Sequence, residues 1–151
     1  MAIVKRKNKN NYDAYKSTEI STANQTKLIV MLYDGAIRFL KTAIDNMDPR
    51  SYDTVNTNIV KTQDIITELM ISLDMDRGGE IAHNLLNLYA YIKKRLLEGN
   101  ISKESSILME VVKLLEGLKA SWEEVSQKEA GKTQMNSSLP REEGISFSIR
   151  G

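Results

Sequence analysis

The chain has 151 residues, which predicts one domain, and 41% of them are hydrophobic, enough for one core of ordinary size. Lysine and arginine number 21 against 20 acidic residues, so the net charge of +1 argues against nucleic acid or an anionic membrane as partner. The absence of cysteine excludes disulfides and thiolate catalysis. No stretch approaches the roughly 18 apolar residues of a membrane span, and no apolar signal region follows the N-terminal lysines. We therefore expect a cytoplasmic protein without membrane insertion.

The chain opens with a polar arm, residues 1–21. Its first part is basic and rich in asparagine, as is typical of a mobile terminus, and Tyr12 and Tyr15 follow. The spacing of apolar residues then predicts a helix over about 23–45. Pro49 ends this region, because proline disfavours helical backbone at the residue before it.

Apolar residues at helical spacing predict three further helices, over about 51–73, 80–98 and 102–128. Gly78 and Gly79 separate the second from the third, and Gly99 is expected to cap the end of the third. Few apolar residues recur with any period after that, which predicts a disordered tail over 129–151. The predicted fold is thus all-α: an extended N-terminal arm (1–21), an antiparallel four-helix bundle (22–128) and a flexible C-terminal tail (129–151).

The first predicted helix carries more apolar surface than one bundle face requires. A core stripe of about 100° holds Leu28, Leu32, Gly35, Ala36, Phe39 and Ala43. Further apolar residues, among them Tyr33, Ile37 and Leu40, widen the arc to roughly 220°. This excess predicts either apolar grooves for a partner helix or a first helix buried by two neighbours and covered by the tyrosine arm.

The later helices show the same excess more mildly. Leu86 and Leu97 lie outside the main face of the third helix, and Leu108 and Val112 flank that of the fourth. The predicted core faces themselves consist of Ile81, Leu85, Leu88, Tyr89, Ile92 and Leu96 in the third helix and of Ile107, Val111, Leu114, Leu115, Leu118, Trp122 and Val125 in the fourth.

Motifs for catalysis are weak in this sequence. Glu80 and His83 have the spacing of half a di-iron carboxylate site, but the chain has no second histidine, so we expect a surface histidine and no metal or other cofactor. No phosphate-binding glycine loop, nucleophile elbow or zinc pattern occurs. Lys93, Lys94 and Arg95 could contact nucleic acid, but no aromatic residues are interleaved with them, which favours a solvated face.

Five segments in order carry a family resemblance: "NNYDAYK", "STANQTKLIVMLYDGAIRFL", "KTQDIITELMISLD", "GGEIAHNLLNLYAYIKKRLLEGN" and "LLEGLKASW". Together they cover about residues 12–125. In this order the chain resembles the flagellin export chaperones, the FliS family of bacteria. It departs from the family at Gln25 and Thr26, where a proline often follows the Thr-Ala start.

The resemblance implies a cytoplasmic, non-enzymatic chaperone that binds the C-terminal segment of flagellin. Such proteins prevent early polymerisation and deliver flagellin to the flagellar type III export gate. The segment would wrap around the bundle as short helices in apolar grooves, part of which the N-terminal arm can occupy. On this basis the arm residues Tyr12, Tyr15 and Ile20 are candidates for a displaceable cover, and the groove candidates are Tyr33, Ile37, Leu40, Leu86, Leu97, Leu108 and Val112. The alternative is a helical self-assembling structural or interaction protein without a flagellin client.

Overall fold

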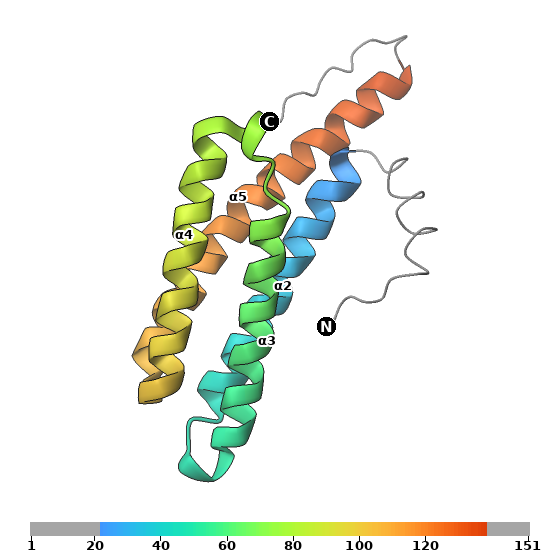
Figure 1. Cartoon of the computed structure of the whole chain (residues 1–151). Coiled ribbons are helices and arrows are strands. Elements are labelled where there is room, and N and C mark those ends of the chain that lie inside the picture. The colour runs from blue at the N-terminus through green and yellow to red at the C-terminus, as the bar shows by residue number, and fades with distance from the viewer. Residues whose placement is uncertain (1–21, 139–151) are drawn as a thin grey trace, which may run out of the picture.

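The computed structural model describes residues 22–138, and the side chains of residues 24–131. The elements are α2 (Thr22–Asp45), the short 3-10 helix η1 (Pro49–Ser51), α3 (Tyr52–Ile71), α4 (Met75–Ser102) and α5 (Ser105–Ser138). No strand occurs in this range, and the chain reverses direction between successive α-helices (Figure 1). The prediction of an all-α antiparallel four-helix bundle is confirmed.

Each helix packs against two neighbours. Helix α2 contacts α3 and α5, and α4 contacts the same two, so α2 and α4 face each other across the bundle. The side chains between the four helices are excluded from water, and burial of each large one contributes about 1.5–3 kcal/mol. This core consists of Tyr33, Ala36, Ile37, Leu40, Ala43, Val55, Ile59, Ile66, Leu69, Tyr89, Ile92, Leu96, Leu108, Val111, Val112 and Leu115.

The structure corrects the predicted core face of the first helix. Tyr33, Ile37 and Leu40 were placed beyond the core stripe, but they are 0%, 5% and 0% exposed. Leu28 was placed inside the stripe and is 52% exposed. The reason is that α3 and α5 both pack on α2, so the whole arc between them is covered. The wide apolar arc reflects burial by two neighbours, as one part of the second sequence interpretation held, while the tyrosine arm of that interpretation lies outside the described residues.

The same correction applies to the fourth helix. Leu108 and Val112 were predicted to flank its core face, but they are 0% and 8% exposed and belong to the main core. Since α5 packs against both α2 and α4, side chains on either side of its central stripe are covered as well. Neither residue is available on the surface of the described structure.

Helix α4 begins and ends at other residues than predicted. It starts at Met75, because the Asp74 carboxylate accepts a hydrogen bond from the backbone N–H of Arg77 at 3.0 Å and caps the first turn. Gly79 then interrupts it with φ 54° and ψ −130°, a conformation that favours glycine. Gly99 is not the predicted cap, since it lies buried inside the helix. The left-handed cap is Lys103, at φ 55°.

Helix α5 is longer than predicted: it extends to Ser138, past the predicted end at about residue 128. The chain has no proline between Pro49 and Pro140, and Gly131 alone costs a helix only about 1 kcal/mol. Its C-terminal end projects past the first turn of α2 (Figure 1). The part of α5 beyond α3 and α4 therefore forms one wall of an open end of the bundle.

Polar contacts on the outer surface fix α5 against its neighbours. The ammonium of Lys119 donates to the carboxylate of Asp34 at 3.1 Å, which lowers the pKa of Asp34. On the other side, Glu110 accepts hydrogen bonds from the Tyr91 hydroxyl at 2.5 Å and from Arg95 at 2.9 Å. The Tyr91 hydrogen bond is the main reason that the pKa of Glu110 is lowered. These pairs join α5 to α2 and to α4.

Candidate functional site: an apolar pocket at one end of the bundle

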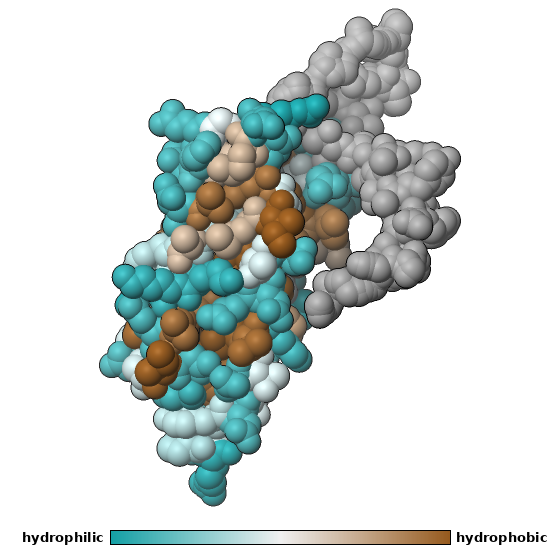
Figure 2. All heavy atoms as spheres, viewed as in Figure 1, coloured by the Kyte–Doolittle hydropathy of each residue, from teal (hydrophilic) through white to brown (hydrophobic). Residues whose placement is uncertain are grey.

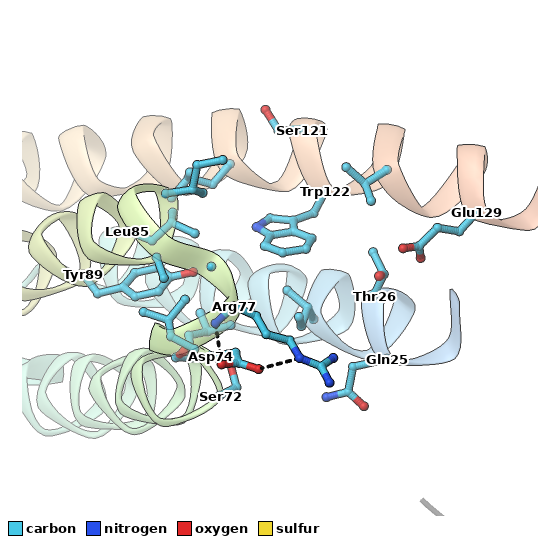
Figure 3. Close-up of a pocket in the computed structure, with 18 of the residues that line it drawn as sticks. Gln25, Thr26, Ser72, Asp74, Arg77, Leu85, Tyr89, Ser121, Trp122 and Glu129 are labelled. Atoms are coloured by element: carbon cyan, nitrogen blue, oxygen red, sulfur yellow. Dashed lines mark hydrogen bonds and ion pairs between the residues drawn. The ribbon is translucent and has the colours of Figure 1, made fainter. Parts of the chain in front are cut away.

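A cavity of about 680 Å³ opens at one end of the bundle (Figure 3). The antiparallel topology brings together here the first turns of α2 and α4, the last turn of α3 and the C-terminal half of α5. The volume lies within the 300–1,000 Å³ typical of ligand pockets. The lining comprises Gln25, Thr26, Ile29, Leu69, Ser72, Leu73, Asp74, Arg77, Gly78, Ile81, Ala82, Leu85, Tyr89, Leu118, Ser121, Trp122, Val125, Lys128 and Glu129.

The inner wall of the pocket is apolar and aromatic. Figure 3 shows the Trp122 indole extending from α5 toward Leu85 and Tyr89 of α4. The Tyr89 hydroxyl is buried and hydrogen-bonded to that of Tyr33, and burial raises the pKa of both phenols. Both phenols therefore remain uncharged around neutral pH. A bound ligand meets an uncharged, apolar wall in this part of the pocket.

Two apolar side chains at the mouth of the pocket are largely open to water. Ile81 of α4 is 65% exposed and Val125 of α5 is 40% exposed, although both were predicted to be core residues. Helix α3 ends at Ile71, and Ile81 and Val125 lie beyond this end, where only three of the four helices continue. They can contact a bound partner without first leaving a packed core.

One edge of the pocket is the short turn before Gly79. Asp74 and Arg77 form an ion pair at 3.8 Å within this turn, shown by a dashed line in Figure 3. A Cβ atom at Gly78 would lie only 2.6 Å from the Cβ of Ala82, so glycine allows this first turn to lie close to the part of α4 that follows Gly79. The sequence prediction of a break at Gly78 and Gly79 is confirmed, and the break shapes the pocket edge.

Most polar groups around the pocket have partners. The hydroxyls of Ser72 and Ser121 donate to the carbonyl oxygens of Leu69 at 2.8 Å and of Gly117 at 3.3 Å. The exception is Glu129, whose Oε1 atom is buried and lacks a hydrogen-bond partner, the one such side-chain atom among the described residues. Figure 3 shows its carboxylate extending from α5 toward α2 near Thr26.

Other apolar side chains are exposed outside the pocket. Leu97 and Ile101, both on α4, are 54% and 76% exposed, and Val60 of α3 is also exposed. Leu86 is half-buried. Figure 2 shows apolar surface in separate patches divided by polar side chains on the face formed by α3 and α4. Leu97 and Leu86 thus lie outside the core as predicted, away from the pocket.

The remaining predicted site residues lie elsewhere. Tyr12, Tyr15 and Ile20 are outside the described residues. His83 is exposed, with Nδ1 3.0 Å from the carbonyl oxygen of Gly79. Over the described part of the chain, no group of three or more histidine and carboxylate side chains is placed to hold a metal ion. None of the helices within residues 22–138 combines the length and apolar character needed to cross a membrane.

The sequence did not reveal the pocket, although one signal could have. In an antiparallel bundle the starts of the first and third helices meet the ends of the second and fourth. The two predicted core residues Ile81 and Val125 both fall at that end, where helices of unequal length leave side chains uncovered. Arg77 and Glu129 carry no sequence pattern that distinguishes them from ordinary surface charges.

The pocket is suited to apolar side chains, and comparisons with known proteins identify the family of the chain. The family model described as flagellar protein FliS matches residues 8–129. The flagellar secretion chaperone FliSB of Pseudomonas aeruginosa is 38% identical over 108 residues, which are 72% of this chain and 86% of that protein. The flagellar secretion chaperone FliS of Bacillus subtilis is 30% identical over 80% of this chain and 89% of that protein. The corresponding protein of Salmonella typhimurium is 34% identical over 72% and 82%. The chain belongs to the FliS family of flagellar secretion chaperones.

Proposed function

We propose that this protein binds the C-terminal segment of flagellin in the cytoplasm, prevents its premature polymerisation and delivers it to the flagellar type III export apparatus. It does so without catalysis or a cofactor, and components of the export gate are its further partners. The observation that carries the proposal is the apolar end pocket in a member of a flagellar secretion chaperone family. A segment that later packs in a filament core is apolar and requires such a surface while it is stored.

The pocket suits one stretch of an amphipathic helix. Its inner wall of Leu85, Tyr89 and Trp122 accepts large apolar side chains, and the exposed Ile81 and Val125 extend the contact at the mouth. Helix-in-groove binding of this kind uses a few apolar side chains spaced three and four residues apart. Ordering a disordered segment costs about 2–5 kcal/mol, which offsets part of the contact energy and keeps the complex reversible.

The N-terminal arm is the candidate cover of the pocket before flagellin binds. Gln25 and Thr26, near the start of α2, line the pocket, so the residues preceding Thr22 join the bundle close to its rim. Tyr12, Tyr15 and Ile20 supply apolar side chains in that arm. Displacement of the arm by flagellin would exchange one apolar contact for another.

The other predicted contact residues divide into two groups. Leu97 and Leu86 on α4 remain candidates for a second stretch of flagellin. The five core residues shape the bundle from within and contribute to binding only through its stability: Tyr33, Ile37, Leu40, Leu108 and Val112.

Isothermal titration with a synthetic peptide of the flagellin C-terminus from the same bacterium tests the proposal. We expect a one-to-one complex of sub-micromolar affinity. Ile81→Asp and Val125→Asp should each weaken it, because a carboxylate at the pocket mouth must lose water when an apolar side chain docks. Met109→Asp is the matched control, since Met109 is exposed near the start of α5, is not part of the pocket lining and is not one of the other candidate contact residues.

Two results would contradict the proposal. One is the absence of binding heat at micromolar concentrations of the wild-type protein and peptide. The other is equal loss of affinity in the pocket variants and in Met109→Asp. Sedimentation of the protein without peptide examines the self-assembling alternative, which predicts oligomers that form through the exposed apolar residues, whereas a chaperone awaiting its client stays monomeric.

A further inference from the structure

One carboxylate oxygen of the half-buried Glu129, Oε1, calls for a physical explanation. Buried polar atoms in folded proteins are almost always hydrogen-bonded, and the cost is larger when the unpartnered group carries charge. Oε1 of Glu129 is buried and has no partner among the described residues. The same residue lines the apolar pocket, on the wall that α5 forms beyond the ends of its neighbours.

The charged groups nearest along the pocket edge do not satisfy this oxygen. Arg77 is paired with Asp74 at 3.8 Å, and its backbone N–H also donates to that carboxylate. Lys128 also lines the pocket, but its ammonium makes no hydrogen bond to Oε1 of Glu129. The pocket therefore has an apolar wall and, at its α5 side, a half-buried carboxylate of which one oxygen has no hydrogen-bond donor.

We propose that Glu129 is the specificity-determining residue of this pocket and accepts a hydrogen bond from a lysine or arginine side chain of the bound segment. This inference rests on the proposed function, and it defines the chemistry of the client: an apolar side chain for the pocket wall with a cationic side chain about one helical turn away. A cation is the fitting donor, because a charge-assisted hydrogen bond also offsets the desolvation of the carboxylate. Apolar segments that lack the cation would bind more weakly.

The carboxylate should cost stability in the unliganded protein and contribute affinity in the complex. Glutamate, glutamine and alanine are all good helix formers, so substitutions at this position leave helix propensity nearly unchanged. Glu129→Gln and Glu129→Ala should therefore unfold at the same urea concentration as the wild type or at a higher one. A purely structural role would produce the opposite shift.

The binding test uses the flagellin C-terminal peptide and titration calorimetry. We expect Glu129→Gln to weaken binding about tenfold, the loss of one charge-assisted hydrogen bond. Glu124→Gln is the control, because Glu124 lies on the same helix, is exposed, and is not part of the pocket lining. Each lysine and arginine of the peptide is then changed to glutamine. For one of these peptides, the affinity for the wild-type protein should fall by about the same factor as the affinity of Glu129→Gln for the natural peptide. Combining that peptide with Glu129→Gln should lower the affinity little further, because both changes remove the same hydrogen bond.

The outcomes separate this inference from the function on which it rests. Absence of wild-type binding overturns the proposed function and this inference with it. Wild-type binding that Glu129→Gln leaves unchanged overturns this inference alone. The same holds if Glu129→Ala lowers the urea midpoint relative to Glu124→Ala, since the carboxylate then has a partner within the protein. Loss of affinity without coupling to any cationic residue of the peptide overturns it as well.

Discussion

The hydroxyl groups of Tyr33 and Tyr89 are hydrogen-bonded to each other in the centre of the bundle. Their rings lie 6.5 Å apart between centroids at a tilt of 43°, and both side chains are buried. They come from α2 and α4, the two helices that face each other across the core rather than pack side by side. Since Tyr89 also lines the pocket, this bond connects the pocket wall to the helix on the opposite side of the bundle.

Tyr33→Phe should destabilise the protein by about 1–3 kcal/mol, because it leaves the buried Tyr89 hydroxyl without its partner. The ring itself is retained, so little apolar contact is lost. Urea unfolding followed by circular dichroism measures the change in free energy. Tyr52→Phe serves as the control, since Tyr52 packs beneath the Lys103 ammonium at 5.1 Å through its ring, which phenylalanine preserves. Equal stability of Tyr33→Phe and wild type would show that the Tyr89 hydroxyl finds another partner in the variant.

Glu110→Gln should flatten the dependence of stability on pH in the acid range. The Tyr91 hydrogen bond lowers the pKa of Glu110 below its ordinary value of 4.5 in the folded state. The unfolded state therefore takes up a proton first, and this contribution to stability is present above pH 4.5 and lost as the pH falls below it. The effect is small, because the Glu110 side chain is 37% exposed and solvent screens it. The measurement is the urea midpoint of the wild type and of Glu110→Gln at several pH values between 6 and 3. Equal loss of stability in the two proteins as the pH falls would refute the prediction.

Two glycines inside helices should respond oppositely to alanine. At Gly99 a Cβ atom would lie 2.8 Å from Leu108 and 3.2 Å from Ile107, so Gly99→Ala overpacks the α4–α5 contact, with a net loss of about 1–2 kcal/mol. At Gly35 the nearest atom is Cδ1 of Ile65 at 3.4 Å, an ordinary contact. Gly35→Ala should instead stabilise the helix by up to about 1 kcal/mol. Thermal unfolding of the two variants measures the effect as the change in Tm relative to wild type. A change of Tm in the same direction for both variants would contradict the packing around these glycines.

Leu40→Ala should cost about 2–5 kcal/mol of stability, as expected for a fully buried leucine. Ile37→Asp should prevent stable folding, because it would bury a carboxylate without a partner. Leu97→Asp, on the exposed outer side of α4, should change stability by less than about 0.5 kcal/mol. Chemical unfolding measures the free energy of unfolding of the three variants. A well-folded Ile37→Asp protein would mean that Ile37 faces solvent.

The sequence predicted the four helices and their order correctly, because the period of apolar residues along each helix is a direct consequence of burial. It did not predict which part of the wide arc on α2 is buried. Apolar residues all around Tyr33 and Ile37 fit either an exposed groove or a second packed neighbour, and only the positions of α3 and α5 distinguish these. Gly99 illustrates a second limit, since a glycine after an apolar run fits both a helix cap and a close helix contact.

No local pattern predicts the pocket, because it arises where the ends of four helices meet, and only the combination of topology with the positions of Ile81 and Val125 points to it. Ile81 and Val125 follow the core period of their helices, yet they lie past the end of α3 and are exposed. The depth of the pocket depends on the length of α5, whose C-terminal half forms one wall. The part of α5 that continues to Ser138 has no periodic apolar residues from which its helical structure could be predicted. The role proposed for Glu129 depends on the burial of its Oε1 atom, which no sequence pattern encodes.

Trp122 is a built-in fluorescent probe of the pocket. It is the chain's single tryptophan, and its indole lies in the pocket wall. The fluorescence excited in indole therefore comes from one known position, with no other tryptophan to dilute the signal. An occupant that removes water from that ring would shift its emission to shorter wavelengths and shield it from soluble quenchers. Arrival and departure of a client could thus be timed in the unmodified protein by stopped flow, without a dye or an added cysteine.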